Sequence, residues 1–162
     1  MARKVMNVIL AGLGGQGVIK ASDILADAAF RDGRDVKKAE VHGMSQRGGS
    51  VTTDVRFGDE VLSPMIPRGE ADFIVVCAPS EVEVVRPLLK AGGTLIAPDF
   101  VDEAKLANRR SLNVALLGAL SHHLDIPEAR WTEAIEAALP ARLHDVNASA
   151  FRLGRETAAA RK

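Results

Sequence analysis

Apolar and polar positions change period along the first 31 residues, and that change predicts the first elements of the fold. Residues 5–11 form an almost unbroken apolar run, which is typical of a buried strand. Over residues 18–31 the apolar side chains recur at helical spacing with charged residues between them, as in an amphipathic helix. The intervening residues 12–17 read Gly-Leu-Gly-Gly-Gln-Gly and predict a tight turn from the strand into the helix.

Strand patterns follow this helix, and Gly33 is its expected C-terminal cap. Residues 35–41 predict a second strand, and the strict alternation over residues 50–57 predicts a third. The turn-forming residues 58–60, followed by the apolar pair 61–62, indicate an antiparallel hairpin. Such a hairpin in an α/β chain would make the sheet mixed.

Two further strands are expected, with a helix between them. Residues 71–78 are apolar on both faces, as a central strand is, and residues 94–97 predict a short one. Ser80 and Glu83 have the spacing of a capping box, which favours a helix start there. Residues 92–93 are both glycine and are expected to end that helix.

Only helical patterns follow residue 101. The strongest covers residues 113–123, another begins near Pro127, and the last covers residues 148–160. Strands and helices in this order predict a single α/β domain over residues 1–162. We expect a Rossmann-like three-layer sandwich with a mostly parallel sheet, one antiparallel hairpin and C-terminal helices.

The composition argues against several classes of protein. Lys plus Arg and Asp plus Glu number 21 each, so the formal net charge is zero, and nucleic-acid proteins usually carry a basic surface. Aromatic residues make up only 4% of the chain, which is few for base stacking. No apolar run approaches the roughly 20 residues that span a bilayer, and the N-terminus does not read as a signal peptide. We therefore expect a soluble, cytoplasmic protein without nucleic-acid or membrane partners.

The chain has one cysteine, Cys77. An iron–sulfur cluster needs about four ligands, so this chain cannot hold one by itself. Cys77 lies inside the apolar run 71–78, which favours a buried core thiol over a nucleophile. The adjacent His122 and His123 would point about 100° apart on a helix, which disfavours a shared metal ion. No metal site and no catalytic residue are predicted.

The first candidate binding residues are Gly12, Gly14, Gly15, Gln16 and Gly17, in the spacing G-x-G-x-x-G. Between a strand and a helix, this spacing lets a ligand approach the backbone closely, and the N–H groups at the helix start favour a phosphate. The alternative is that these glycines only allow the helix and the strand to pack together.

A second glycine-rich stretch has neither helical nor strand periodicity. It consists of Gly43, Met44, Ser45, Gln46, Arg47, Gly48 and Gly49. Arg47 suits a phosphate or carboxylate because its planar guanidinium binds bidentately, although most arginines only form surface salt bridges. His42 before it is expected to be structural. Glu40, near the end of a second strand, could bind the ribose of a dinucleotide.

The two glycine-rich stretches together are more specific than either alone. The first is Gly-Leu-Gly-Gly-Gln-Gly at 12–17, and the second is His-Gly-Met-Ser-Gln-Arg-Gly-Gly-Ser-Val at 42–51. The pair resembles the gamma-type domain of the 2-oxoacid:ferredoxin (pyruvate/ketoisovalerate) oxidoreductases, and within them the small (beta) subunits of the indolepyruvate ferredoxin oxidoreductases. The other matching pieces are residues 63–64, 71–72, Asn113, 117–118, Trp131, Asn147, 150–151 and Gly154.

The resemblance implies a subunit of an enzyme that converts an aryl 2-oxoacid and CoA to acyl-CoA, carbon dioxide and reduced ferredoxin. Thiamine diphosphate and the iron–sulfur clusters are then expected on a large (alpha) partner subunit, and the isolated small chain is expected to be inactive. The glycine-rich stretches would line a cleft facing CoA or the partner. The segment between Pro98 and Asn113 is shorter than expected for the family, which leaves room for a divergent paralogue.

Two other functions compete with this interpretation. One is a free-standing NAD(P)-binding oxidoreductase, with Glu40 on the ribose. The other is a scaffold subunit whose glycine-rich stretches only form an interface.

Overall fold

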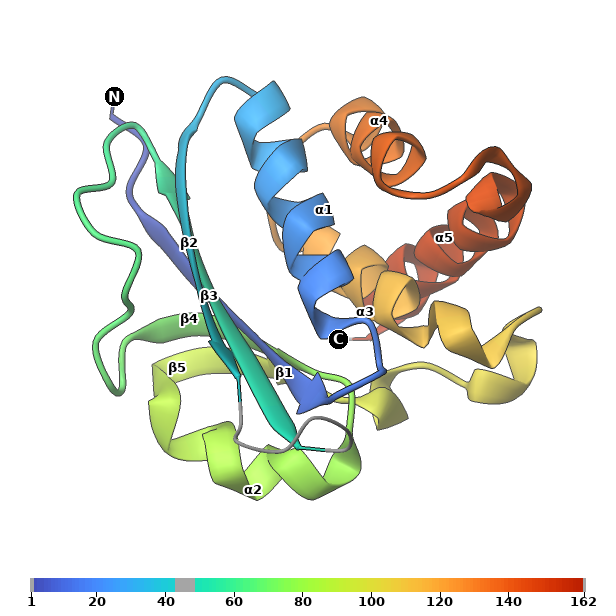
Figure 1. Ribbon diagram of the computed structural model, residues 1–162, viewed down its shortest axis with the longest axis horizontal. Helices are drawn as coiled ribbons and strands as arrows, with labels where there is room; N and C mark the ends of the chain where they lie inside the picture. The colour runs from blue at the N-terminus through green and yellow to red at the C-terminus, as the bar shows by residue number, and fades with distance from the viewer. Residues whose placement is uncertain (1, 43–48, 162) are drawn as a thin grey trace.

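The computed structural model describes residues 2–42 and 49–161, which fold around one five-stranded sheet (Figure 1). The strand order is β2-β3-β1-β4-β5. The strands are β1 (Met6–Leu13), β2 (Asp35–His42), β3 (Ser50–Gly58), β4 (Ala71–Val76) and β5 (Leu89–Ile96). The predicted α/β class is therefore confirmed.

The expectation of a mostly parallel sheet is wrong. β1, β4 and β5 are parallel to one another, but β3 runs antiparallel to both of its neighbours, β1 and β2. Each antiparallel ladder joins eight residue pairs and each parallel ladder four, so antiparallel pairing dominates. The reason is the short connection from β2 to β3, because a parallel return needs a crossover of a dozen residues or more.

The predicted hairpin partner of β3 is also wrong. Residues 61–62 form no strand, and the segment 59–70 instead runs irregularly over the sheet. Side chains of two strands hold this segment, since the Val61 N–H donates to Asp35 at 2.7 Å and the Ile66 N–H donates to Asp54 at 3.0 Å. Asp54 is buried, and its desolvation raises the pKa of its carboxyl group. β3 therefore finds its antiparallel partners in β1 and β2.

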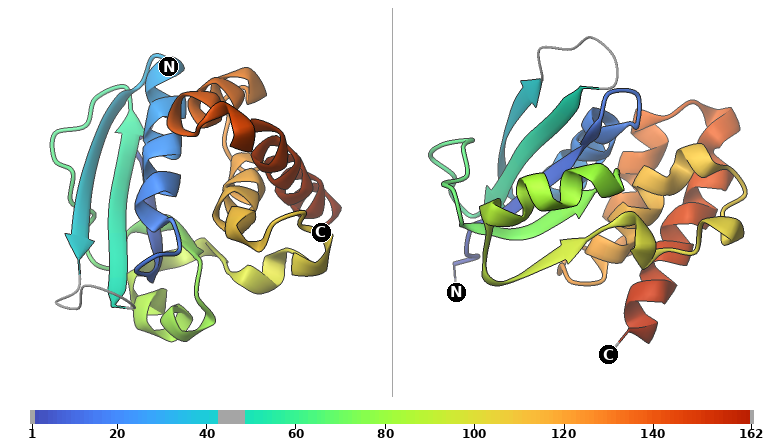
Figure 2. Two further views of the ribbon diagram at one scale, coloured as in Figure 1. Left: turned by 45° about the vertical axis from the view of Figure 1, so that its right-hand side comes forward. Right: turned by 90° about the horizontal axis from the view of Figure 1, so that it is seen from below.

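Four long helices lie on one side of the sheet (Figure 2). They are α1 (Val18–Arg31), α3 (Leu112–Ser121), α4 (Glu128–Ala138) and α5 (His144–Ala160). α1 and α3 lie against the strands, and α4 and α5 pack outside them. The expected C-terminal cap of α1 is confirmed, because Gly33 has a φ of +78° and its N–H donates to the Phe30 carbonyl. The prediction of helices alone after residue 101 also holds, with short 3₁₀ turns between them.

The opposite face carries a thinner layer made of segment 59–70 and a short helix, α2 (Val82–Val85). The long helix expected here is wrong, because residues 79–88 form one helical turn flanked by two 3₁₀ turns. Ser80 and Glu83 make no capping bond. The glycines at 92–93 lie inside β5, which begins five residues earlier than predicted, at Leu89. Pro87 lies in the second 3₁₀ turn, where a continuous helix would lose a backbone hydrogen bond.

Each face of the sheet has its own hydrophobic cluster. The larger cluster, under the four long helices, includes the buried Trp131. α3 and α5 cross at two glycines, Gly118 and Gly154, whose Cα atoms face the backbone of the other helix. None of the helices in the described ranges combines the length and apolar character needed to cross a bilayer.

Candidate functional site

The candidate site begins at the turn between β1 and α1. β1 ends at Leu13 and α1 begins at Val18, so residues 14–17 form the connection. Gly15 and Gly17 have φ angles of +89° and +75°, which side chains with a Cβ rarely adopt. The turn lies at the carboxyl end of β1, next to the carboxyl end of the parallel strand β4. Ligands of open α/β sheets bind at this kind of edge.

Gln16 holds the turn in place through both ends of its amide. Its Oε1 accepts a hydrogen bond from the Leu13 N–H at 2.8 Å, and its Nε2 donates to the Cys77 carbonyl at 3.3 Å. Cys77 directly follows β4. The Gln16 side chain, which was expected to contact a ligand, therefore forms hydrogen bonds within the protein. These bonds connect the glycine turn to the end of β4.

Packing explains part of the glycine spacing. A Cβ at Gly12 would lie 2.8 Å from the Val18 Cγ2 and 3.1 Å from the Cys77 Cβ. These distances are too short for a methyl group, so Gly12 is needed where the strand meets the helix. A Cβ at Gly15, in contrast, would meet nothing within 4 Å. Gly12 thus fits the packing explanation, whereas Gly15 leaves its backbone open on one side.

The second glycine-rich stretch joins the first at its described end. The Gly14 N–H donates to the Gly49 carbonyl at 2.9 Å, and Ser50 pairs with Leu13 in the β1–β3 ladder. Gly43, Met44, Ser45, Gln46, Arg47 and Gly48 lie outside the described residues. The flanks of the stretch are placed by the β2–β3 pairing of His42 with Val51. The first stretch and the described flanks of the second therefore lie at the same end of the strands, where β1 ends and β3 begins.

A cavity of about 470 Å³ opens beside the first turn. We call it the glycine cavity, and it is lined by Gly15, Gln16, Gly17, Cys77, Arg109, Arg110, Leu112 and Asn113. No Asp or Glu is among these residues. A cavity that combines a glycine turn at a helix start, two guanidinium groups and no acid suits an anion.

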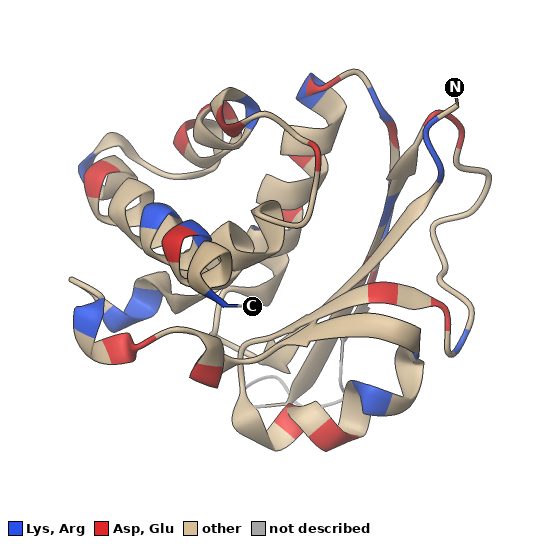
Figure 3. Ribbon diagram, turned by 180° about the vertical axis from the view of Figure 1, so that it is seen from behind, with Lys and Arg blue, Asp and Glu red and all other residues tan. Residues whose placement is uncertain are grey.

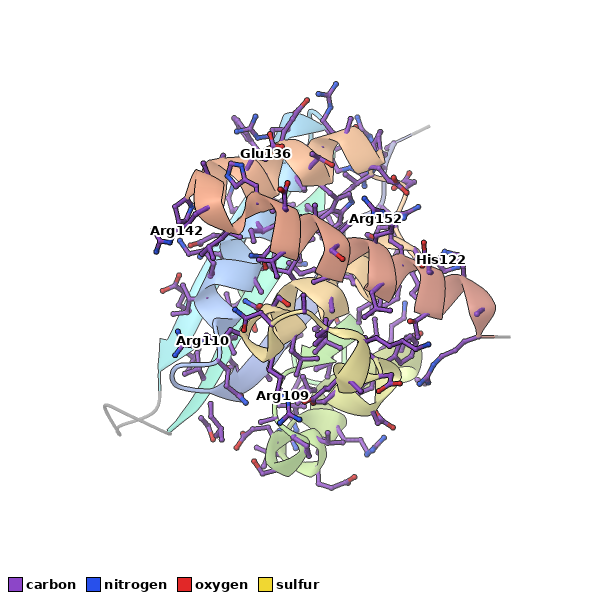
Figure 4. The ribbon with its side chains drawn as sticks, turned by 90° about the vertical axis from the view of Figure 1, so that its right-hand side faces the viewer. Arg109, Arg110, His122, Glu136, Arg142 and Arg152 are labelled. Atoms are coloured by element: carbon purple, nitrogen blue, oxygen red, sulfur yellow. The ribbon has the colours of Figure 1, made fainter. Side chains whose placement is uncertain are left out.

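Arg109 and Arg110, both labelled in Figure 4, also line this cavity and were missed in the sequence. They lie in a 3₁₀ turn before α3, and Asn108 caps that turn by accepting the Arg110 N–H at 2.9 Å. Neither guanidinium forms an ion pair or hydrogen bond within residues 2–42 and 49–161. An arginine pair after a capping asparagine, directly before an apolar helix, is the signal that could have identified them.

Asn113 connects α3 to the glycine turn. Its Nδ2 donates to the Gly17 carbonyl at 3.0 Å, and only 8% of the residue is exposed. This bond fixes the start of α1 against the start of α3. The arginine turn and the glycine turn are thereby held on either side of one cavity.

Cys77 also lines the cavity, but its thiol is not reactive. Burial raises the pKa of this thiol to about 12, so almost no thiolate exists at neutral pH. A single buried thiol does not fit an iron–sulfur cluster, which needs about four ligands. Within the described ranges no three His, Cys, Asp or Glu side chains are arranged to hold a metal ion.

Glu40 does not lie beside the glycine turn. β3 is inserted between β1 and β2, and Glu40 on β2 pairs with Thr53 of that intervening strand. Its carboxylate accepts a hydrogen bond from the Lys38 Nζ at 2.6 Å. The acid that binds ribose in a dinucleotide fold needs the strand next to the glycine turn, so this position does not favour that role.

Replacing Gly17 with alanine tests how far the turn depends on glycine. The new Cβ would lie 2.5 Å from the Asn113 Nδ2, at a φ where alanine is strained. We expect the free energy of unfolding to fall by about 2 kcal/mol, because strain and the displaced Asn113 bond add. Urea unfolding followed by circular dichroism measures this. Stability equal to that of the unaltered chain would contradict the tight contact at Gly17.

Comparisons with known proteins agree with this architecture. The family model for pyruvate ferredoxin/flavodoxin oxidoreductase matches residues 7–157. "Indolepyruvate oxidoreductase subunit IorB" of Thermococcus kodakarensis is 36% identical, with 93% of this chain and 95% of that protein covered. That alignment runs over 191 positions, more than the 162 residues of this chain, so the relative carries inserted residues.

Two solved structures share the fold. A 2-oxoglutarate:ferredoxin oxidoreductase from Magnetococcus marinus, solved with 2-oxoglutarate, coenzyme A and succinyl-CoA, superposes with a TM-score of 0.85 at 23% identity. The match covers 98% of this chain but only 32% of that longer one. The gamma subunit of a keto/oxoacid ferredoxin oxidoreductase from Geobacter sulfurreducens gives 0.80 at 22% identity, covering 97% and 98%. The resemblance seen in the glycine-rich stretches is confirmed: this chain belongs to the pyruvate ferredoxin/flavodoxin oxidoreductase family.

Proposed function

We propose that this chain is the small subunit of an indolepyruvate-type 2-oxoacid:ferredoxin oxidoreductase, and that its glycine cavity faces CoA and the large subunit. The reaction would convert an aryl 2-oxoacid and CoA to acyl-CoA and carbon dioxide, with transfer of electrons to ferredoxin. The relative in Thermococcus kodakarensis, which covers nearly the whole of both chains, supports the subunit type.

The observation that carries the proposal is the character of the glycine cavity. It lies where β1 and β4 end, and Gly15 and Gly17 border it on one side. Arg109 and Arg110 border it on the other side, unpaired within the described part of the chain. CoA carries several phosphate groups, and guanidinium groups with free backbone N–H groups are suited to bind them.

The residues of this chain support a division of labour with a partner. Cys77 alone cannot hold a cluster, so the iron–sulfur clusters would belong to the large subunit. The same subunit would carry thiamine diphosphate. This chain would bind and orient the phosphate end of CoA while the partner carries out the electron transfer. Holding a co-substrate in this way lowers the entropic cost of the reaction on the partner.

The other functions have less support. Binding of NAD(P) would need Glu40 close to the glycine turn, and β3 separates the two. A scaffold without any ligand would not need a cavity lined by two unpaired arginines and no carboxylate among the described residues.

Co-purification tests the subunit assignment. The chain, tagged and returned to its source organism, is expected to bring down one large subunit that contains thiamine diphosphate and iron–sulfur clusters. The complex is expected to reduce ferredoxin with an aryl 2-oxoacid, and only when CoA is present. Activity of the large subunit at the full rate without this chain would contradict the proposal, as would micromolar NAD(H) binding by the chain alone.

Replacing Arg109 with alanine tests the contact with CoA. We expect the KM for CoA to rise about tenfold in the complex while kcat changes little, because one charge-assisted contact to phosphate is lost. Arg68→Ala is the matched control, since Arg68 is an exposed arginine in segment 59–70, on the other face of the sheet. An equal KM for CoA in both variants would remove Arg109 from the site. Arg47→Ala in the same assay tests the second glycine-rich stretch.

A further inference from the structure

A second cavity, of about 340 Å³, adjoins the glycine cavity and shares Arg110 and Asn113 with it. We call it the basic cavity. Lys20 of α1 lines it on one side, and Arg142, from the turn before α5, lines it on another. Figure 4 shows Arg110 and Arg142 on the same face of the molecule. Segments far apart in the chain thus place three basic side chains around one hollow.

The lining of the basic cavity carries positive charge only. Among the described residues no Asp or Glu lines it, although the formal net charge of the chain is zero. Over α4 and α5, in contrast, the two signs are interleaved (Figure 3). Like charges around one hollow repel each other, and a bound anion would relieve that repulsion.

The three cations are largely unused by the protein itself. Within residues 2–42 and 49–161 the guanidinium groups of Arg110 and Arg142 form no ion pair or hydrogen bond. Among the described residues the Lys20 Nζ donates only to the Ala138 carbonyl, at 3.3 Å. Several other arginines of the chain are bound to a carboxylate, as Arg34 is to Asp125 at 2.6 Å. The cations of the basic cavity are therefore available to a ligand.

Buried amides form the floor of the cavity and fix its shape. Asn113 and Asn147 are 8% and 6% exposed, and each uses one amide hydrogen within the protein. The Asn147 Nδ2 donates to the Leu143 carbonyl at 2.9 Å, which holds the turn that carries Arg142. The His144 Nε2 lies 2.8 Å from the Leu139 carbonyl and fastens the same connection to α4. Each amide retains a second N–H that can donate to an oxygen atom.

We propose that the basic cavity binds a phosphate group, through Lys20, Arg110 and Arg142, with the amides of Asn113 and Asn147 beneath it. The ligand class is a phosphomonoester, which carries close to two negative charges at neutral pH. Because the two cavities share Arg110, one ligand with several phosphate groups can occupy both. Its assignment to the terminal 3′-phosphate of CoA rests on the function proposed above, whereas the phosphate site itself does not.

Calorimetry on the full chain tests the site directly. The probe is adenosine 3′,5′-bisphosphate, with inorganic phosphate as a second probe. We expect Arg142→Ala and Lys20→Ala each to weaken binding of the bisphosphate about tenfold. Arg152→Ala is the matched control, because it removes another exposed arginine that has no side-chain partner among the described residues. Arg152 lines a different groove, between α4 and α5. Equal losses in the Arg142 and Arg152 variants, or no binding at millimolar probe, would overturn the site.

Kinetics of the complex identify the source of the phosphate. Dephospho-CoA lacks only the 3′-phosphate, so the unaltered complex is expected to prefer CoA, and Arg142→Ala is expected to abolish that preference. If the variant loses the bisphosphate yet still prefers CoA, the site stands but its assignment to CoA is overturned, and a free phosphorylated compound is its ligand.

The two proposals can fail separately. A chain that binds the bisphosphate through Arg142 but assembles with no large subunit would retain the site and lose the proposed function. If the complex is active and CoA-dependent but its chain binds the bisphosphate equally well without Arg142, the proposed function stands and the phosphate site is lost.

Discussion

Replacing Gly154 with alanine is expected to lower the free energy of unfolding by about 3 kcal/mol. In the native structure a Cβ at this position would lie 1.8 Å from the Ala115 carbonyl oxygen and 2.8 Å from the Ala119 nitrogen. Both are backbone atoms of α3, so no side-chain rotation relieves the contact and the two helices must separate. The gain in helix propensity, about 1 kcal/mol, is too small to offset this.

Thermal unfolding followed by circular dichroism measures the effect, and a fall in Tm of roughly 6–12 °C is expected for a chain of this length. Ser149→Ala is the control, because Ser149 is exposed on the same helix and its replacement is expected to change the stability by less than about 0.5 kcal/mol. Gly118→Ala should behave like Gly154→Ala, since its Cβ would lie 2.0 Å from the Phe151 carbonyl oxygen. A Tm within two degrees or so of the unaltered chain would contradict the close crossing of α3 and α5.

Trp131→Ala is expected to destabilise the chain by about 3–5 kcal/mol, the usual cost of emptying a buried aromatic position. Trp131 is completely buried beneath the long helices, with its ring centroid 5.5 Å from that of Phe151. Its removal would leave a cavity at the junction of α4 and α5, which the backbone cannot close without moving both helices.

Trp131→Phe separates packing from polarity at the same position. The indole Nε1 is buried without a hydrogen-bond partner among the described residues, so its N–H contributes an unfavourable desolvation cost. Phenylalanine removes that N–H and keeps most of the apolar contact, and a loss below about 1.5 kcal/mol is expected. Trp131 is the only tryptophan, so urea unfolding must be followed by circular dichroism rather than by intrinsic fluorescence. Equal losses in the two variants would contradict the packing role.

Both predictions concern the helical layer that supports the basic cavity. Arg142 lies in the turn before α5 and Asn147 lies in the first turn of that helix. Gly154 sets how closely α5 approaches α3. Asn113, at the start of α3, borders both cavities. A shift of α5 away from α3 would therefore move Arg142 relative to Asn113 and would weaken phosphate binding as well as stability.

The sequence by itself determined the features that depend on neighbouring residues. The helix over residues 18–31 was predicted to the residue and the strand before it to within two residues, because apolar period and glycine spacing are local signals. The helices after residue 112 were predicted for the same reason. The paired glycine-rich stretches also indicated the family to which the chain belongs, because both stretches can be read directly from the order of the residues.

Only the tertiary structure decided what depends on contacts distant in the chain. The position of β3 between β1 and β2 follows from pairing energies that no local pattern contains, and it separated Glu40 from the glycine turn. The helix after residue 79 is shorter than expected, because residues 89–96 form β5, which pairs in parallel with β4. Arg110 and Arg142 lie 32 positions apart and look like ordinary surface arginines in the sequence. They line one cavity because α5 packs on α3, which Gly118 and Gly154 permit by lacking a Cβ.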